Sequence, residues 1–454
     1  MPFSHLSSTT SSKSGSDAVS TPLVMAVVVL RVIVGAVFVY SGFVKAIDPW
    51  GGFYKITEYL QALGWSEVLN LSLFAACGVA AVEFVLGVLL LVGAYRRAVP
   101  LLLTLLMLLL TPLTLWLAVT DAVPDCGCFG DALHMSNWAT FGKNLLLLAG
   151  LIFLLWKGRN VRGWYGPAVQ WIVAALSLAV VLAVAYYGYF TQPLIDFRPY
   201  KVGTKLTEAK SEADDEFIFI YEKDGQQAEF TIDSLPDEDA GWSYVDRRPK
   251  SPQRAAVIER TGHQLSLLDG GIDVTADMIG QGDVLLVLFA DLPEVSIAHT
   301  FVINELADYA HAHGAAIVGV TSANEEQVAK WNDISMADYP IVNADDSDIK
   351  MVARGNPAVA YVSQGVLQWK RTLGSIPADR IHDAKLNLAT LSDDFAPSAI
   401  LRGIVVPYLM AMLALLFVNR IHLLIRRLFR KSEPTNDKAD EAEPVNGSDN
   451  QTTE

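Results

Sequence analysis

The sequence predicts a polytopic α-helical membrane protein that carries an α/β domain outside the membrane. Three observations support this fold class. The 454 residues are 52% hydrophobic and only 18% charged, so the chain is too apolar on average for a soluble protein. Apolar runs long enough to cross a bilayer precede residue 190 and recur near the C-terminus. Between them lies a stretch of roughly 200 residues with ordinary polar composition.

Six stretches are apolar and long enough to be transmembrane helices. They are residues 22–44, 70–94, 98–119, 139–156, 168–190 and 399–418. The first is too long for a secretory signal peptide and contains Arg31, so we expect it to be retained. Short connections join the first four spans, which favours an up-down four-helix bundle over 22–156 with two further helices beside it.

The basic residues predict the orientation, because Lys and Arg concentrate in cytoplasmic loops. They follow spans two, four and six as Arg96, Arg97, Lys157, Arg159, Arg162, Arg420, Arg426, Arg427, Arg430 and Lys431. The loop between spans three and four has none. We therefore expect an inner-membrane protein with both termini in the cytoplasm, and with that loop and the polar domain in the periplasm. We also expect residues 1–21 to be disordered and 419–454 to form a basic, then acidic, cytoplasmic tail.

The loop between spans three and four contains two of the three cysteines, Cys126 and Cys128, in the segment DCGCFGD. Residues two apart in a strand lie about 6.6 Å from one another, and a turn brings them into disulfide range. Gly127 supplies the backbone freedom that so small a ring needs. Such a bridge is strained and readily reduced, which favours a redox-active pair.

Other interpretations of this loop stay open. Asp125 and Asp131 flank the pair, and we expect their charges to raise the thiol pKa values. The bridge could be purely structural, or His134 could complete a Cys-x-Cys-x5-His metal set. The spacing is atypical for zinc, so we predict no metal. Cys77 falls in span two, where a cysteine is usually an apolar packing residue.

Two charged residues fall near the middle of membrane spans. Arg31 lies in the first span and Glu83 in the second, and the two spans run in opposite directions. Because a lone charge at that depth is costly, we expect Arg31 and Glu83 to pair inside the bundle. Such a pair either fixes the helix register or takes part in proton or quinone handling. The net charge of −15 argues against a nucleic-acid partner.

The membrane part resembles the DoxX/MauE superfamily of four-helix membrane proteins. The resemblance rests on RVIVGAVFVYSGFVKAIDPWG, on the glutamate in AVEFVLGVLLLVG and on the CGCFG loop followed by FGKN. The CGCFG loop is most similar to the MauE (methylamine utilisation) branch. The resemblance implies a component of envelope redox metabolism that acts in disulfide formation beside a thioredoxin-like partner. It implies that Cys126 and Cys128 are the catalytic redox pair and that Arg31 and Glu83 are family bundle positions.

The polar part begins as a β-rich segment over 191–280, with a hairpin that turns at Asp224-Gly225. From residue 283 buried strands alternate with helices, and a proline-led hairpin closes the domain. This order is similar to the thioredoxin fold over 281–395. Asn356-Pro357 stands where thioredoxins have their cis-proline, so we predict a cis bond at Pro357. The position of the thioredoxin Cys-x-x-Cys reads Asp291 to Ser296, without cysteine.

The sequence thus supports two functions. In the first, Cys126 and Cys128 relay electrons between an extracytoplasmic thiol or disulfide protein and the membrane, with a membrane quinone as the candidate acceptor and the lipid bilayer as surroundings. In the second, the protein is a non-enzymatic membrane assembly or scaffold protein, with a structural CGC loop and a partner-binding outer domain.

Overall fold

The structure, a computed structural model, contains among its described residues six helices that are long and apolar enough to cross a membrane. It describes residues 21–65, 71–120, 123, 127–158, 161–206, 217–223, 226–230, 243–249, 265–383 and 386–431. The six helices are α1 (Thr21–Ile47), α3 (Ser72–Val92), α4 (Ala98–Thr120), α5 (Asn137–Lys157), α6 (Gln170–Phe190) and α13 (Pro397–Lys431). Each of the six predicted spans coincides with one of them, which confirms a multi-pass membrane protein.

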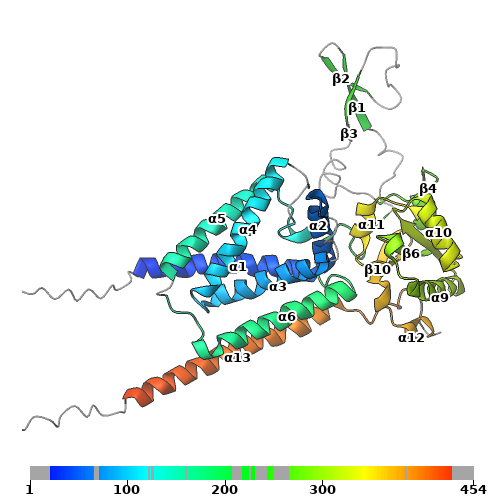
Figure 1. Ribbon diagram of the computed structural model, residues 1–454. Helices are drawn as coiled ribbons and strands as arrows, with labels where there is room; N and C mark the ends of the chain where they lie inside the picture. The colour runs from blue at the N-terminus through cyan, green and yellow to red at the C-terminus, as the bar shows by residue number, and fades with distance from the viewer. Residues whose placement is uncertain are drawn as a thin grey trace, which may run out of the picture.

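Helices α1 and α3 form the tightest pair of the bundle, because glycines let their backbones approach. A Cβ atom added at Gly42 of α1 would lie 2.4 Å from the backbone nitrogen of Phe84, and one at Gly35 would lie 2.9 Å from that of Leu91. The pairing of 42 with 84 and of 35 with 91 makes the two helices antiparallel. Helix α4 packs against α5 on the other side of the bundle (Figure 1).

The fifth span belongs to the bundle core rather than lying beside it. Helix α6 packs against α1 and α3, and Val173, Val181 and Val184 are buried in the same apolar cluster as the first four helices. Helix α13 runs along α6 on the outside (Figure 1). There the Tyr165 hydroxyl donates to the Met412 carbonyl, and the Ser177 and Tyr408 hydroxyls lie 2.9 Å apart.

A short helix that the sequence analysis did not predict, α2 (Pro49–Ala62), follows α1. Asp48 caps it by accepting a hydrogen bond from the Gly51 amide, and Pro49 occupies its first turn, where a missing N–H costs nothing. Its 14 residues span about 21 Å, which is too short to cross a bilayer.

The polar part contains a seven-stranded mixed sheet, which we call the sheet domain. Its strands are β4 (Leu268–Asp269), β5 (Ile272–Asp273), β6 (Asp283–Phe289), β7 (Ala316–Thr321), β8 (Ile341–Asn343), β9 (Ala358–Ser363) and β10 (Val366–Thr372). Their order is β10-β9-β6-β7-β8-β4-β5, with β6, β7 and β8 parallel and the other pairs antiparallel. Because β4 and β5 belong to this sheet, the domain begins before the predicted boundary at residue 281.

Helices cover both faces of the sheet, so strand β6 is buried on both sides. Leu285, Val287 and Phe289 face one apolar cluster, and Val284, Leu286 and Leu288 face the other. The first face is covered by α9 (Ala298–Ala312), α10 (Glu325–Ser335) and α12 (Ala378–Ile381), and the second by α8 (Thr275–Ile279) and α11 (Asp346–Val352). The predicted alternation of strands and helices from residue 283 is confirmed.

A second, small sheet precedes this domain. It consists of β1 (Phe217–Lys223), β2 (Gln226–Phe230) and β3 (Ser243–Pro249), in the order β2-β1-β3. Lys223 pairs with Gln226 in the antiparallel strands β1 and β2, which flank the predicted turn residues Asp224 and Gly225 in the chain. These two turn residues lie outside the described part of the chain.

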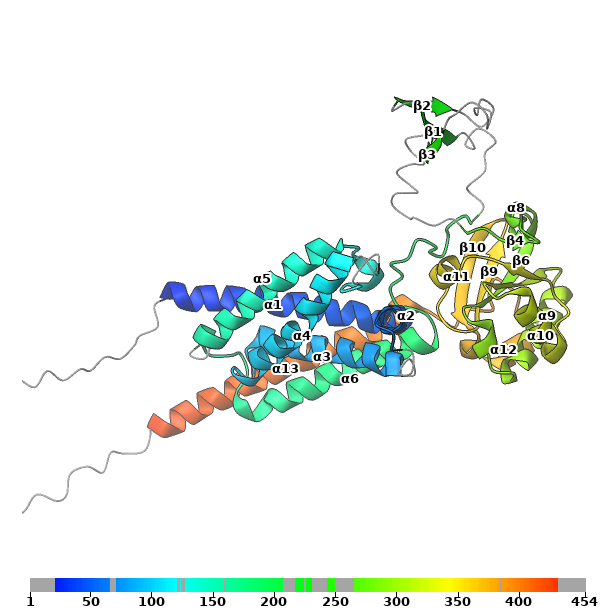
Figure 2. The same ribbon diagram turned by 45° about the horizontal axis from the view of Figure 1, so that its top comes forward.

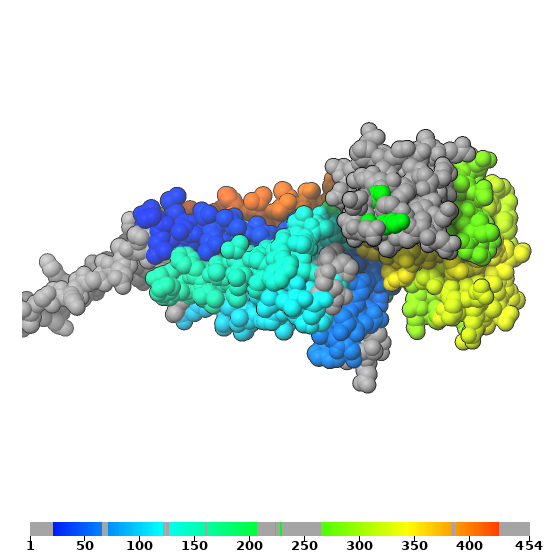
Figure 3. Space-filling model, turned by 90° about the horizontal axis from the view of Figure 1, so that it is seen from above, coloured from blue at the N-terminus to red at the C-terminus, as the bar shows by residue number. Residues whose placement is uncertain are grey.

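The sheet domain sits at one end of the helical bundle, which we call the domain end. The beginning of α1 and the end of α13 both lie at the opposite end (Figure 2). The loop between α4 and α5 opens at the domain end. In the space-filling view the sheet domain lies directly against the bundle there (Figure 3).

Candidate functional site

The cysteine loop, residues 121–136 between α4 and α5, turns sharply at two glycines. Gly127 and Gly130 have φ values of +59° and +50°, a conformation in which residues with a Cβ atom are strained. The Gly130 amide donates to the Gly127 carbonyl over 3.0 Å, which closes the turn around Cys128. The positive φ explains why glycine is favoured at position 127, while the small disulfide ring for which that freedom was expected stays a prediction. Cys126 lies outside the described residues.

Two side chains of α1 hold the backbone of Cys128. The Cys128 carbonyl oxygen accepts hydrogen bonds from Lys45 Nζ over 2.6 Å and from Ser41 Oγ over 2.8 Å. Lys45 Nζ also donates to Ser41 Oγ (2.7 Å) and to Glu83 Oε2 (2.7 Å), so all three ammonium protons have acceptors. Ser41 Oγ lies 2.8 Å from Glu83 Oε2 as well, and its single proton serves the carbonyl or the carboxylate.

The expected pair between Arg31 and Glu83 does not form. Glu83 is buried and pairs with Lys45. Arg31 lies beside the C-terminus of α3, where a Cβ added at Gly93 would be 2.3 Å from its Nη1. Lys45 is 14 residues from Arg31 along α1, about 21 Å at 1.5 Å per residue. The expectation was wrong because both charges were assigned to mid-membrane depth, whereas Glu83 lies towards the domain end and Arg31 towards the opposite end.

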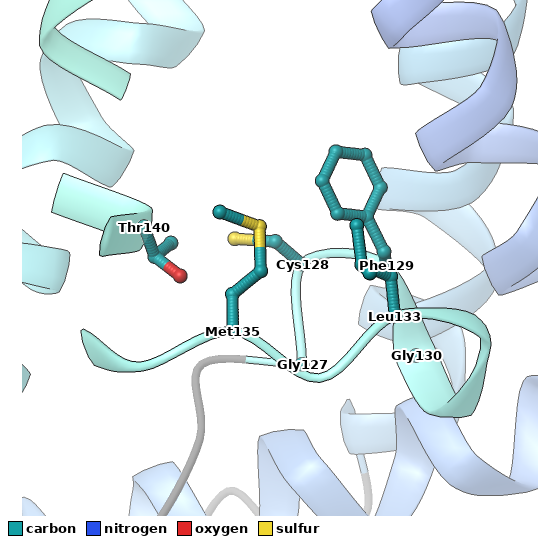
Figure 4. Close-up of a pocket in the computed structure, with 7 residues that line it drawn as sticks. All are labelled: Gly127, Cys128, Phe129, Gly130, Leu133, Met135 and Thr140. Carbon is teal, nitrogen blue, oxygen red and sulfur yellow. The ribbon is translucent and has the colours of Figure 1, made fainter. Parts of the chain in front are cut away.

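The Cys128 side chain faces a small cavity inside the loop. The cavity is lined by Gly127, Cys128, Phe129, Gly130, Leu133, Met135 and Thr140. Figure 4 shows the sulfur atoms of Cys128 and Met135 pointing into the same space, with the Thr140 hydroxyl across from them. The Lys143 ammonium lies 4.3 Å from the centre of the Phe129 ring, which fixes the wall of the cavity from α5.

Arg354 of the sheet domain joins the cysteine loop to the bundle. Its Nη2 donates to Asp131 Oδ2 over 2.7 Å and to Asp48 Oδ2 over 2.8 Å, and its Nε donates to Asp48 Oδ2 over 2.9 Å. Asp131 belongs to the cysteine loop and Asp48 caps α2. We call these three side chains the Arg354 clasp. Arg354 is only 5% exposed, so the clasp lies within the contact between the sheet domain and the bundle.

Burial and opposite charge compete within the clasp. Burial by itself would raise the pKa of Asp48, but the charge of Arg354 and its hydrogen bonds lower this pKa below its ordinary value. Burial would likewise lower the pKa of Arg354, but the carboxylates of Asp48 and Asp131 raise it above its ordinary value. Both shifts favour the charged forms, so the clasp is an ion pair at neutral pH.

A second set of contacts anchors the backbone of Arg354 to the end of α6. The side-chain amide of Gln192 accepts from the Arg354 amide over 3.1 Å and donates to its carbonyl over 2.6 Å. Gln192 is buried. Because these bonds pair both backbone groups of one residue, they hold the sheet domain in one register relative to the bundle.

The Arg354 clasp adjoins the edge of the sheet domain where the thioredoxin-like motif was expected. The Asn356–Pro357 peptide bond is cis, as predicted. The Asn356 side chain accepts from the Asp291 amide over 3.2 Å and donates to the Asp291 carbonyl over 2.7 Å. Asp291, the first residue of the segment that replaces the Cys-x-x-Cys, therefore lies against the cis-proline loop, on the edge that leads through Gly355 to Arg354.

Sequence reasoning did not identify Ser41, Lys45 or Arg354 as site residues. Ser41 and Lys45 carried a usable signal, because residues four apart share one helix face and both fall on the face that includes Gly42. Arg354 carried none, because its carboxylate partners precede it by 223 and 306 residues.

The membrane region matches a known family. The model of the family described as "Methylamine utilisation protein MauE" matches residues 23–157, and that of a "Domain of unknown function (DUF8463)" matches residues 215–251. No curated protein and no solved structure matches the chain. The first match covers the helices α1 to α5 and the whole cysteine loop. Residues 23–157 are therefore a MauE-family membrane region, to which a mixed α/β domain is joined in the same chain.

Proposed function

We propose that the protein is a thiol–disulfide relay of the cell envelope, in which Cys126 and Cys128 exchange electrons with a client protein. The observation that carries this proposal is the way in which the backbone of Cys128 is held. Its carbonyl is held by Lys45 and Ser41, its loop turns on two glycines with positive φ, and its side chain faces a cavity. A loop held so firmly at its backbone presents its sulfur in one place, as an exchange reaction requires.

The exchange is balanced in two steps. A thiolate of the client attacks the loop disulfide, forms a mixed disulfide and releases one loop thiolate. The second client thiol then resolves the mixed disulfide, so that the client is oxidised and Cys126 and Cys128 are reduced. A two-electron acceptor must then reoxidise the loop dithiol, and we propose a lipid-soluble quinone, which takes up two electrons and two protons.

The arrangement of the chain supports an extracytoplasmic site. The cysteine loop and the sheet domain share the domain end, and the beginning of α1 and the end of α13 share the other. The basic residues cluster at that other end, for example Arg96 and Arg97 after α3. By the positive-inside rule the domain end faces the periplasm, where disulfides persist.

We infer that the sheet domain is a thioredoxin-like module that has lost its cysteines and acts as a docking element. Its support is the order β7-β6-β9-β10 with α9 between β6 and β7 in the chain, and the contact of the cis-proline loop with Asp291. The domain contributes no thiol, because all cysteines lie in the membrane region. Tethered beside the cysteine loop, it raises the local concentration of a bound client.

A second candidate function is that of a non-enzymatic membrane assembly protein with a structural CGC loop. The Arg354 clasp and the Gln192 pairing favour it, because they join the domain to the bundle as a scaffold would require. In the relay, Cys126 and Cys128 alternate between dithiol and disulfide, whereas in the assembly protein they stay a disulfide.

Thiol trapping in whole cells separates them. In the relay, Cys126 and Cys128 cycle, so blocking respiration should accumulate them in the reduced form. Cys77→Ala provides the background, because it removes the remaining cysteine from the assay. A pair that stays oxidised with respiration blocked would support the assembly protein. A Cys128→Ser variant with normal function would contradict both.

A further inference from the structure

We propose that Arg354 is a positioning residue for the cysteine loop, which it holds in place and whose neighbouring negative charge it compensates from the sheet domain. The inference rests on the proposed thiol–disulfide function and deepens it, because it assigns the sheet domain an effect on the cysteines. The domain then not only docks beside the loop but also makes its thiols reactive.

Hydrogen bonds hold the guanidinium of Arg354 in one orientation. Arg354 Nη1 donates to the Lys350 carbonyl over 2.7 Å, while Nη2 and Nε donate to the carboxylates of Asp48 and Asp131. A buried arginine in this many charge-assisted bonds has one orientation. The loop carboxylate and the α2 carboxylate are thus brought to one cation that neither the loop nor the bundle supplies.

Asp131 lies close to Cys128 along the backbone. Asp131 is three residues after Cys128, so the two Cα atoms are at most about 11 Å apart even in an extended chain. The turn between Gly127 and Gly130 makes the path shorter. This backbone separation is about one Debye length, and the Arg354 clasp is buried, so salt screens the field of Asp131 at Cys128 only in part.

Charged side chains of both signs surround the cysteine loop. The cation Lys45 is paired with Glu83, so this pair adds little net charge. Lys55 of α2 reaches Gly127, where an added Cβ would lie 3.1 Å from its Cγ, and Lys143 of α5 stacks on Phe129. The other charged groups that face the loop or the clasp in the described part of the chain are Asp48, Asp131, Lys350 and Arg354. Glu58 pairs with Lys55, Asp346 pairs with Lys350, and the charge of Arg198 also lowers the pKa of Asp48. Without Arg354, Asp131 loses its ion-pair partner, and Asp48 keeps only the smaller effect of Arg198.

The consequence concerns the thiolate, which is the reactive form of cysteine. Nearby carboxylates disfavour it, and flanking aspartates were the feature of the sequence that argued against a reactive pair. The Arg354 clasp removes much of that disadvantage as long as the sheet domain is docked. Release of the domain would leave the loop with slower thiols.

The test measures alkylation of the cysteine loop in the reduced, full-length protein. All variants carry Cys77→Ala, and mass spectrometry follows iodoacetamide labelling of the Cys126–Cys128 peptide between pH 6 and 10. Arg354→Gln should move the pH midpoint of labelling upward and slow labelling at pH 7 by about three- to tenfold. Asp131→Asn should move the midpoint downward and accelerate labelling, because it removes a negative charge and leaves the cation.

These opposite signs distinguish charge compensation from simple docking. Both variants lose the Arg354–Asp131 ion pair, so a purely structural role would change labelling in the same direction in both. The double variant should lie between the two single variants. Arg380→Gln is the matched control, since Arg380 pairs with Asp394 at a distance of 3.5 Å within the sheet domain, and it should leave labelling unchanged.

Shifts in the same direction, or an unchanged midpoint in Arg354→Gln, would overturn the inference. The labelling assay measures thiol reactivity and not electron flow. A negative result for Arg354 can therefore be distinguished from a negative result for the relay. A pair that never cycles in cells but shows opposite shifts would overturn the relay alone. A pair that cycles without these shifts would overturn the role of Arg354 alone.

Discussion

Lys45 and Glu83, on the antiparallel helices α1 and α3, form an ion pair of 2.7 Å directly beneath the cysteine loop. The same ammonium donates to the Cys128 carbonyl, so the charge pair of the bundle and the position of the cysteine are set by one contact. Glu83 is 5% and Lys45 17% exposed in their side chains. A pair so poorly hydrated tolerates the loss of one partner badly, because the remaining charge is left buried.

Glu83→Gln should therefore destabilise the membrane region by about 2–3 kcal/mol, at or just below the lower end of the range for a broken buried pair, since Lys45 retains some contact with solvent. Thermal unfolding of the purified protein in detergent would measure it. The double variant Lys45→Met/Glu83→Leu should lose less unfolding free energy than the sum of the losses in Lys45→Met and in Glu83→Leu. Equal or greater loss would show that the two charges do not interact.

Arg31 and Glu83 should behave as independent residues. Arg31 lies about 21 Å along α1 from the level of Lys45, so the effects of Arg31→Met and Glu83→Gln on unfolding should add within about 0.5 kcal/mol. The measurement is a double-mutant cycle in the same detergent. A coupling of 1 kcal/mol or more, roughly, would restore the pairing expected from the sequence.

The closeness of α1 and α3 depends on Gly42. Gly42→Ala places a Cβ 2.4 Å from the Phe84 amide nitrogen, so the helices must separate, and we expect a loss of about 1–3 kcal/mol. Gly78→Ala is the matched control, because an added Cβ there meets nothing within 4 Å. It should leave the stability unchanged or raise it slightly through better helix propensity. Similar losses in both variants would show that helix separation is not the cause.

The junction between α6 and the sheet domain should weaken in acid. Asp196 pairs with Lys370 over 2.6 Å and with Arg198 over 2.8 Å. Burial would raise the pKa of Asp196, but these two cations lower it from 3.8 to about 2. A carboxyl whose pKa is depressed by folding stabilises the folded state above its unfolded pKa and loses this contribution as the pH falls from about 4 through 2.

Asp196→Asn removes that acid dependence. Between pH 5 and 2 the wild-type protein should lose about 2 kcal/mol more of its unfolding free energy than the variant. Denaturant unfolding at several pH values, followed by tyrosine and tryptophan fluorescence, would measure the difference. Parallel pH profiles of the two proteins would contradict the assignment of the charged pairs to Asp196.

Much of the architecture follows from local sequence patterns. The six spans are recognisable because a bilayer demands about 20 apolar residues in a row, a property that each stretch has by itself. Strand β6 was predictable for a similar reason, since a buried apolar run acts over a few residues. Gly127 was identified in the same way, because its positive φ is a property of one turn. The cis bond before Pro357 was predicted instead from its place in the expected thioredoxin-like order of strands and helices.

The contacts that make the site were decided only by the tertiary structure. Whether Glu83 meets Arg31 or Lys45 depends on the register between α1 and α3, which close glycine contacts set and hydropathy does not reveal. Arg354 reaches Asp48 and Asp131 across 306 and 223 residues. The sequence by itself thus determined which segments enter the membrane and where the cysteines lie. The folded chain decided which charges surround them, because ion-pair partners are chosen by proximity in space.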